Sequence, residues 1–340
     1  MKARGVVAGL LVVGCAVQAP ASIAPTATIS PFPTATAVPT RQPTASPNSE
    51  SPLDGSGLAT LIDQDSLLAH LEALQEIADA VPGGTRATGT PGFLASMRYV
   101  KDVLEAAGYR VKRQDFTVSG VPSANLLAEH RGSGEGVIMI GAHLDSVAAG
   151  PGINDNGSGV AALLVIASRL PEMSPPDRTI RFAFWGAEEG GSFGSAHYVE
   201  SLTADRLAEI GAYLNFDMLA SPNAVRFVYD EDDAPAGSDA LTELFVSQLL
   251  AAGLAWDPID VDGRSDHGPF AAAGIPISGL FSGGRELVTE GQAAQHGAIA
   301  GQPSDPCSDD PCDTIDNVDL ATLEDMARIV ARVLVDLATD

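Results

Sequence analysis

The stretch from Gly136 to Leu170 constrains the fold of this chain more than any other. It opens with a continuous apolar run, Gly136 to Gly141, of the length expected for a buried strand. A polar segment rich in glycine and asparagine follows, and the Ala/Leu-rich run from Val160 to Leu170 predicts a helix. A strand, a polar loop and a helix in this order form the repeating unit of parallel α/β sheets.

The polar loop carries residue types that bind metals. His143 and Asp145 lie two residues apart, so on a strand they would face the same side, and Asp155 lies in a dense turn cluster. Ligand sites in open α/β sheets lie beyond the carboxyl ends of the strands, and histidine with carboxylates suits zinc. The alternative interpretation is a polar loop whose His and Asp residues only make turn hydrogen bonds.

The same alternation of strands and helices continues along the chain. Helices are expected at 66–80, with Ser66 as the cap, and at 90–107, 195–202, 239–252 and 318–337. Further strands are expected at 109–118 and 124–130, as an edge hairpin, and at 178–186, 211–219, 226–230 and 275–281. The pattern predicts an α/β domain with a largely parallel sheet.

Acidic residues lie at or just after the ends of two of these strands. Glu188 and Glu189 follow Phe184 and Trp185, which favours a half-buried cleft where the pKa of a carboxyl group is raised, although a surface turn would also accommodate them. Asp217 lies near the end of the strand at 211–219, and an acid in an apolar strand is costly to bury unless it is paired or binds a metal. These positions favour a metal site.

The N-terminal region has the features of an export signal. Lys2 and Arg4 precede a short apolar core, Val6 to Val13, which is too short to span a bilayer. Val12-Val13-Gly14-Cys15 resembles a bacterial lipoprotein processing box, in which Cys15 is acylated; the alternative is an ordinary signal peptide. We predict a signal peptide over 1–19, a Pro/Thr-rich disordered stalk over 20–53 and a globular domain over 54–340.

Charge narrows the expected partners. The chain of 340 residues carries 44 acidic against 19 basic residues, a net charge of −25 at pH 7. Such an excess argues against nucleic acid and against anionic membrane surfaces as electrostatic partners. We therefore expect an exported monomer, secreted or on the cell surface, that meets the membrane only through a lipid anchor.

Several motifs together carry a resemblance to a known family. HLDS, GINDNGSG, FWGAEEGG, NFDM, GRSDHGPF and CDT occur in this order between Leu58 and the C-terminus. The set resembles the M28 family of zinc aminopeptidases, especially its small secreted bacterial members. The resemblance implies a mostly parallel mixed central sheet flanked by helices on both faces, as in phosphorylase/hydrolase-like zinc peptidases.

The resemblance also implies the parts of the site. In the family, two zinc ions bridged by one carboxylate polarise the scissile carbonyl and lower the pKa of a bound water, while a nearby glutamate moves the proton. Carried over by motif, His143 and Asp217 would bind one zinc, Asp155 would bridge, Glu189 would bind the second and Glu188 would be the general base. Asp145 would be the carboxylate that orients the His143 imidazole.

Other family positions match as well, with one departure. Gly263, Arg264 and Phe281 would line the substrate pocket, and Cys307 and Cys312 would form a disulfide. Relatives carry a Tyr-His pair between those cysteines, which supplies a transition-state donor and the last ligand of the second zinc. Here Ser308 and Asp309 stand in their places. Asp309 would have to serve as an oxygen ligand, and Ser308 cannot reach as far as a tyrosine hydroxyl.

The sequence therefore predicts a metallo-aminopeptidase with two zinc ions per chain. It would remove N-terminal residues, chiefly apolar ones, from peptides outside the membrane, with Glu188 contacting the free ammonium group. Two alternatives remain open. One is a degenerate M28-like binding domain on the cell surface, and the other is a carboxypeptidase or dipeptidase of the same fold.

Overall fold

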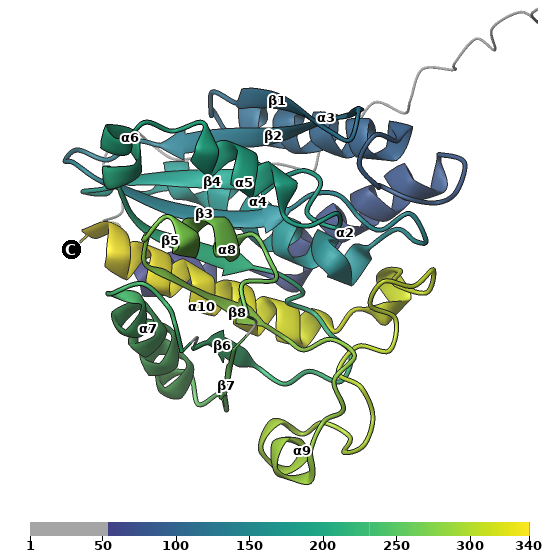
Figure 1. Ribbon diagram of the computed structural model, residues 1–340. Coiled ribbons are helices and arrows are strands. Elements are labelled where there is room, and N and C mark those ends of the chain that lie inside the picture. Colours follow the sequence, from purple (N-terminus) through teal and green to yellow (C-terminus); the bar gives the residue numbers. More distant parts are fainter. Residues whose placement is uncertain (1–53, 231, 261, 340) are drawn as a thin grey trace, which may run out of the picture. The chain divides into compact units, whose positions relative to one another are not determined.

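A computed structural model describes residues 54–230, 232–260 and 262–339 (Figure 1). All of these residues belong to one compact unit. The predicted signal peptide, Cys15 and the stalk lie outside the described residues. Among the residues that are described, no helix is both long enough and apolar enough to cross a membrane.

The centre of the fold is an eight-stranded mixed sheet with the strand order β1-β2-β4-β3-β5-β8-β6-β7 (Figure 1). Its inner strands β4, β3, β5 and β8 run parallel. The pairs β1–β2, β2–β4 and β6–β8 are antiparallel, and β7 runs parallel to β6. The strands are β1 Lys112–Val118, β2 Val121–His130, β3 Val137–His143, β4 Thr179–Trp185, β5 Ile210–Phe216, β6 Phe227–Tyr229, β7 Asp257–Ile259 and β8 Ile277–Phe281. The predicted mixed, mostly parallel α/β sheet is confirmed.

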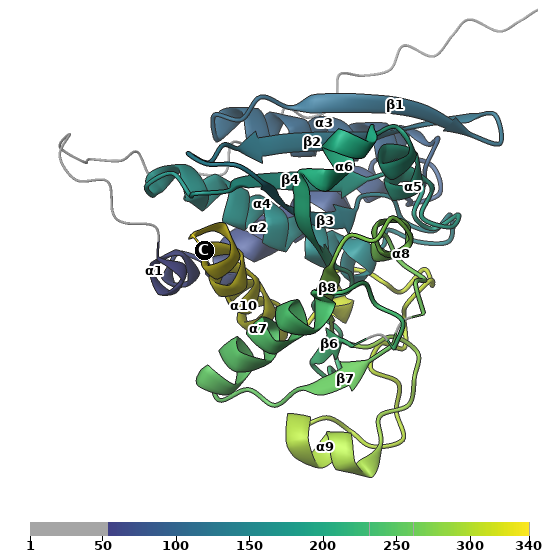
Figure 2. The ribbon, with the colours of Figure 1, turned by 60° about the vertical axis from the view of Figure 1, so that its left-hand side comes forward.

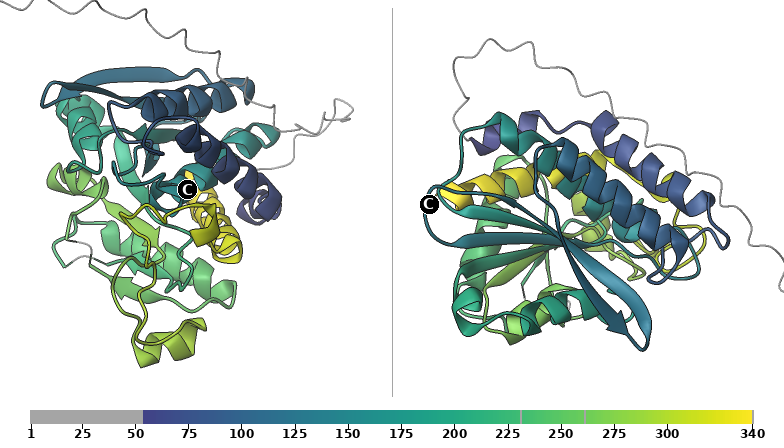
Figure 3. Two further views of the ribbon diagram at one scale, coloured as in Figure 1. Left: turned by 90° about the vertical axis from the view of Figure 1, so that its right-hand side faces the viewer. Right: turned by 90° about the horizontal axis from the view of Figure 1, so that it is seen from above.

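Helices cover both faces of this sheet. They are α1 Gly55–Thr60, α2 Gln64–Asp79, α3 Pro91–Ala106, α4 Gly159–Arg169, α5 Phe193–Glu200, α6 Ala204–Ala208, α7 Ser238–Ala251, α8 His267–Ala272, α9 Glu290–His296 and α10 Leu320–Thr339. One face carries the larger core, into which α2, α3, α4, α7 and α10 bury apolar side chains, and the other carries a smaller core under α5, α6 and α8. Seen from above, the helices lie on either side of the fanned strands (Figure 3, right).

Local capping chemistry sets where the early helices begin. Thr90 caps α3 by accepting a hydrogen bond from the backbone N–H of Phe93, with Pro91 in the first turn, as the sequence predicts. The expected cap of α2 at Ser66 was wrong. The N-cap is Asp63, whose carboxylate accepts from the Ser66 N–H at 2.7 Å, so the helix starts one turn earlier. α1, which the sequence analysis did not predict, lies beside α10 (Figure 2).

The register of the inner strands brings their polar ends together. His143, the last residue of β3, lies opposite Trp185, the last residue of β4, and Gly141 lies opposite Asn215 in β5. Because these strands are parallel, the loops that follow them meet at one edge of the sheet. Glu188 and Asp217, which follow β4 and β5, therefore converge on His143.

Candidate active site

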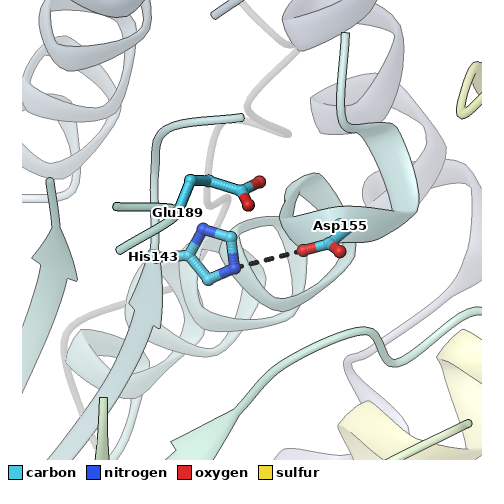
Figure 4. Close-up of side chains that lie close together, drawn as sticks. All are labelled: His143, Asp155 and Glu189. Carbon is cyan, nitrogen blue, oxygen red and sulfur yellow. Dashed lines mark ion pairs between the residues drawn. The ribbon is translucent and has the colours of Figure 1, made fainter. Parts of the chain in front are cut away.

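His143 is the centre of a buried cluster of carboxyl groups. Its Nε2 atom lies 3.2 Å from an oxygen of Asp155, 3.2 Å from an oxygen of Asp217 and 3.9 Å from an oxygen of Glu188. Glu189 approaches from the loop after β4, and the ligand atoms of His143, Asp155 and Glu189 all lie within 4.8 Å of one another (Figure 4). Five residues that the sequence analysis assigned to one site thus meet in space.

The other ring nitrogen of His143 is held by the chain that follows it. Nδ1 lies 3.0 Å from the main-chain carbonyl oxygen of Asp145 and 4.0 Å from the carboxylate of the same residue. The Asp145 carboxylate instead accepts from the backbone N–H of Glu188 at 3.1 Å. Asp145 therefore connects His143 to the loop that carries both glutamates, with the carbonyl, rather than the expected carboxylate, nearest the ring.

The loop that carries Asp155 is held from two sides. Asp313 accepts from the backbone N–H groups of Asn154 at 2.8 Å and of Asp155 at 2.9 Å. The side-chain amide of Asn154 donates to Asp305 at 2.6 Å, in the segment just before the cysteine loop. These hydrogen bonds within the protein hold the Asp155 backbone in place without a bound ligand.

Arg86 is a site residue that sequence reasoning missed. Its side chain is completely buried and donates to three main-chain carbonyls, those of Leu144 at 2.5 Å, Pro151 at 2.7 Å and Gly152 at 2.5 Å. It thereby links the end of β3 to the turn before Asp155. No motif or periodicity marks Arg86, so only its contacts reveal this role.

Burial, together with repulsion between neighbouring carboxylates, raises the pKa of several acids in the cluster. Burial and the neighbouring Asp155 carboxylate raise the pKa of Glu189 to about 10. Burial raises the pKa of Asp155, and it raises the pKa of Glu188 well above its usual value with help from Asp266. Burial alone would lower the pKa of His143, but the carboxylates of Asp217 and Glu188 raise it well above 6.5. A cation among such groups would relieve the repulsion.

The donor set fits a zinc-type ion. One imidazole and several carboxylates are the side chains that bind zinc. One oxygen of Glu189 is buried and has no hydrogen-bond partner among the described residues. A buried carboxylate oxygen without a partner is costly in a protein interior, and a metal ion would satisfy it.

The predicted pocket residues lie around this cluster with different degrees of exposure. Gly263 and Arg264 are exposed, and the next residue, Ser265, donates to Asp217 at 2.7 Å, so their loop is attached to the cluster. Phe281 is half-buried and stacks on Phe227 with ring centroids 6.0 Å apart. Asp266, which the sequence analysis did not assign, is completely buried, and burial raises its pKa to about 7.

The cysteine loop forms the outer rim. Cys307 and Cys312 form the disulfide that the resemblance implied. Ser308 is buried, whereas Asp309 is exposed with φ of 60°, and its charge contributes to raising the pKa of Asp155. The charge of Asp309 therefore acts on Asp155, but Asp309 does not belong to the group formed by His143, Asp155 and Glu189.

A family model places this geometry in context. Residues 125–334 match the model of peptidase family M28. The chain belongs to peptidase family M28. The match includes every residue of the cluster and the whole cysteine loop.

Curated relatives agree with this assignment. Leupeptin-inactivating enzyme 1 of Streptomyces exfoliatus is 44% identical over 266 residues, which cover 77% of this chain and 59% of that protein. "Probable lipoprotein aminopeptidase LpqL" of Mycobacterium tuberculosis is 38% identical over 314 residues, which cover 83% of this chain and 62% of the relative. The M28 chain thus spans about three fifths of the length of these two relatives.

Solved structures share the fold at low sequence identity. The aminopeptidase from Aneurinibacillus sp. strain AM-1 superposes with a TM-score of 0.69 at 18% identity, covering 84% of this chain and 96% of that one. A glutaminyl cyclase of Porphyromonas gingivalis superposes with a TM-score of 0.62 at 20% identity, covering 82% and 99%. The M28-type fold is therefore shared by proteins named for different reactions, and the site must decide the chemistry.

Proposed function

We propose that this M28 protein is a zinc-dependent aminopeptidase. The observation that carries the proposal is the convergence of His143, Asp155 and Glu189 on one point, with Glu188 directly beside them. The names of its relatives as aminopeptidases support the same activity.

The residues sort into ligands and a base. His143 and Asp217 would hold one zinc ion, Asp155 would bridge, and Glu189 and Asp309 would complete the second site. A bound ion would act as a Lewis acid that polarises the scissile carbonyl and lowers the pKa of a water molecule. Two ions per chain would also neutralise the repulsion that raises the pKa of Asp155 and Glu189.

Glu188 would move the proton. Its backbone N–H is held by Asp145, and its side chain accepts from the Ser192 hydroxyl at 3.2 Å. The Glu188 carboxylate would take a proton from water while the water oxygen bonds to the carbonyl carbon of the substrate. The peptide C–N bond then breaks, and the same proton passes from Glu188 to the leaving amine.

The acid-rich site also suits a free N-terminus. A substrate ammonium group placed among these buried carboxyl groups would gain charge-assisted hydrogen bonds, whereas a carboxylate would be repelled. This favours an exopeptidase that acts at N-termini over a carboxypeptidase. The exposed position of Asp309 and the presence of Ser308 favour the second candidate, an M28-like binding domain without turnover.

Export and anchoring complete the proposal. A relative named as a lipoprotein supports acylation at Cys15 after removal of a signal peptide. The mature protein would act as a monomer on peptides outside the membrane, either on the cell surface or released. The peptidase activity itself would require neither nucleic acid nor contact with the membrane surface beyond the lipid anchor.

Hydrolysis of aminoacyl p-nitroanilides by the mature chain with added zinc tests the activity. We expect cleavage of leucine-type substrates by the wild-type protein and loss of cleavage in Glu188→Gln. A preference for substrates with a blocked N-terminus would favour the carboxypeptidase or dipeptidase alternative. A folded, zinc-loaded wild-type protein that cleaves none of these substrates would favour the binding domain.

A further inference from the structure

A basic cavity lies at the other edge of the sheet from the His143 cluster. It has a volume of about 520 Å³, within the range of small-molecule sites, and is lined by Arg110, Lys112, Leu127, Glu129, Arg131, Arg181, Tyr198, Leu202 and Arg206. Arg181 pairs in register with Met139, four residues before His143 in β3. At about 3.3 Å per residue, that places the cavity on the order of 13 Å from the cluster.

The charge of this cavity is opposite to that of the protein. The whole chain has 19 basic and 44 acidic residues, yet the cavity is lined by five basic residues and one acidic residue. A random sample of the chain's charged residues would be mainly acidic. The lining therefore concentrates positive charge in one place, and such a concentration attracts anions.

Ion pairs within the protein neutralise only part of the positive charge in the cavity. Arg181 donates twice to one oxygen of Glu129, at 2.7 and 2.9 Å, and Arg206 pairs with Glu209 at 2.7 Å. The ion pair between Arg131 and Glu129 is long, at 3.9 Å, and the Arg131 side chain is largely exposed. Arg110 and Lys112 make no ion pair with any described residue.

The hydrogen-bond donors of the cavity also favour an anionic ligand. The Tyr198 hydroxyl accepts from Arg181 at 2.7 Å, so its own hydrogen remains to be donated. Burial raises the pKa of Tyr198, so the hydroxyl stays protonated at neutral pH. The cavity thus offers guanidinium, ammonium and hydroxyl donors, and its single carboxylate is already engaged with Arg181. A matching ligand must be rich in acceptors.

Five separate segments build this arrangement. Arg110 and Lys112 lie at the start of β1, Glu129 and Arg131 at the end of β2, and Arg181 in β4. Tyr198 comes from α5 and Arg206 from α6, which precedes β5 (Figure 1, left). The side chain of Arg181 is 15% exposed and so is largely covered, whereas Arg110, Lys112, Arg131 and Arg206 are exposed.

We infer that this cavity binds a small oligoanionic phosphate group. Arg110 and Arg131 offer planar guanidinium forks that match phosphate oxygens bidentately, while Arg181 and Arg206, which are paired with Glu129 and Glu209, add positive charge. The phosphate could belong to a free oligophosphate or to a lipid headgroup, because both present the same oxygens. The inference is independent of the proposed peptidase activity.

The test is titration of the mature protein with inorganic pyrophosphate at low ionic strength, followed by calorimetry. We expect saturable binding of one pyrophosphate per chain. The double variant Arg110→Ala/Lys112→Ala, which removes two exposed cations without known ion pairs, should bind at least about tenfold more weakly, a change of about 1.4 kcal/mol. Near-ultraviolet circular dichroism verifies that the variant remains folded.

The matched control is Lys101→Ala/Arg113→Ala. It removes the same charge from exposed positions outside the cavity and should leave the affinity within about twofold. An equal loss of affinity in this control would overturn the inference, because binding would then reflect the overall charge.

A second arm uses vesicles of phosphatidylcholine with and without phosphatidylglycerol. Binding to the anionic vesicles that depends on Arg110 and Lys112, without binding of pyrophosphate, would assign the site to a lipid phosphate. Absence of binding to both pyrophosphate and anionic vesicles would refute the inference.

Discussion

The floor and the rim of the candidate site are built by different means. The floor consists of His143, Asp155, Asp217 and the two glutamates. Arg86 donates to the carbonyls of Leu144 and Gly152, Asp313 accepts from the backbone N–H of Asp155, and the backbone N–H of Met218, next to Asp217, donates to Asn156. The rim is the loop from Cys307 to Cys312, tied by its disulfide and by bonds from the half-exposed Arg285 to the carbonyl of Ser308 and to Asp310.

This difference matches the place where the resemblance led us to expect a departure from the family pattern. On the floor, each ligand loop depends on bonds that a substitution would leave unsatisfied in the interior, which is costly. At the rim, Asp309 is exposed, and its replacement leaves no buried partner behind. The residues that the family resemblance assigned as ligands and base lie on the floor, whereas Ser308 and Asp309, the expected departures from the family pattern, lie at the rim. Four experiments, in order of expected effect, would sharpen or break this contrast.

The largest effect is expected on the floor, at the proposed base. Glu188→Gln keeps the shape but cannot accept a proton, so kcat should fall about 10²- to 10⁴-fold. Zinc content, measured by mass spectrometry of the dialysed protein, should be unchanged because Glu188 is not a proposed ligand. Glu189→Gln serves as the comparison and should reduce zinc content. Equal activity of Glu188→Gln and wild type would remove Glu188 from the mechanism.

The second effect concerns the stability of floor and rim. Arg86→Met would leave three carbonyls without their buried donor and would remove the positive charge near the acids, so the free energy of unfolding should fall by about 3–5 kcal/mol. Arg285→Met at the rim should cost about 1 kcal/mol or less, because its ion pair with Asp310 is half-exposed. Urea unfolding of both variants measures the difference. Similar losses in the two variants would contradict the contrast.

Restoring the family pair at the rim should increase activity. Ser308→Tyr with Asp309→His would return the transition-state donor and the missing ligand, and one such donor is worth about 10²–10³ in rate. The measurement is kcat/KM for leucine p-nitroanilide with saturating zinc, with each single variant as control. If the double variant is no faster than wild type, the present Ser308 and Asp309 already complete the site in another way.

The smallest effect concerns a helix that supports the floor. His70 in α2 is buried and bonds to the Tyr99 hydroxyl at 2.6 Å, and burial lowers its pKa from 6.5 to about 4. Between these values the unfolded chain binds a proton that the folded chain does not. This part of the stability is therefore complete above pH 6.5 and declines as the pH falls toward 4, by about 3 kcal/mol in all.

The check is the difference between wild type and His70→Gln across that range. The variant cannot be protonated there, so its free energy of unfolding should decline less from pH 7 to pH 4 than that of the wild type. Parallel declines in the two proteins would show that His70 does not carry this acid sensitivity.

Much of the floor was predictable from sequence. An apolar strand that ends in His143, and acids that follow the strands now called β4 and β5, favoured a metal site, and the family resemblance implied that His143, Glu188, Glu189 and Asp217 belong to it. The reason is geometric: parallel strands share one carboxyl edge, so residues at their ends converge whatever the loops contain. The sheet itself was predictable from the pattern of strands and helices, because apolar periodicity reflects which faces are buried.

Only the tertiary structure decided what holds that site and what lies away from it. Arg86 acts through main-chain carbonyls that are distant in sequence, and hydrogen bonds to carbonyls leave no trace in residue identity. The basic cavity draws its five cations from between residues 110 and 206, and their separation gives no pattern until β1, β2, β4 and α6 bring them together. The sequence by itself indicated the candidate ligands, because strand ends are local features. The supports and the cavity depended on long-range packing, which sequence periodicity does not encode.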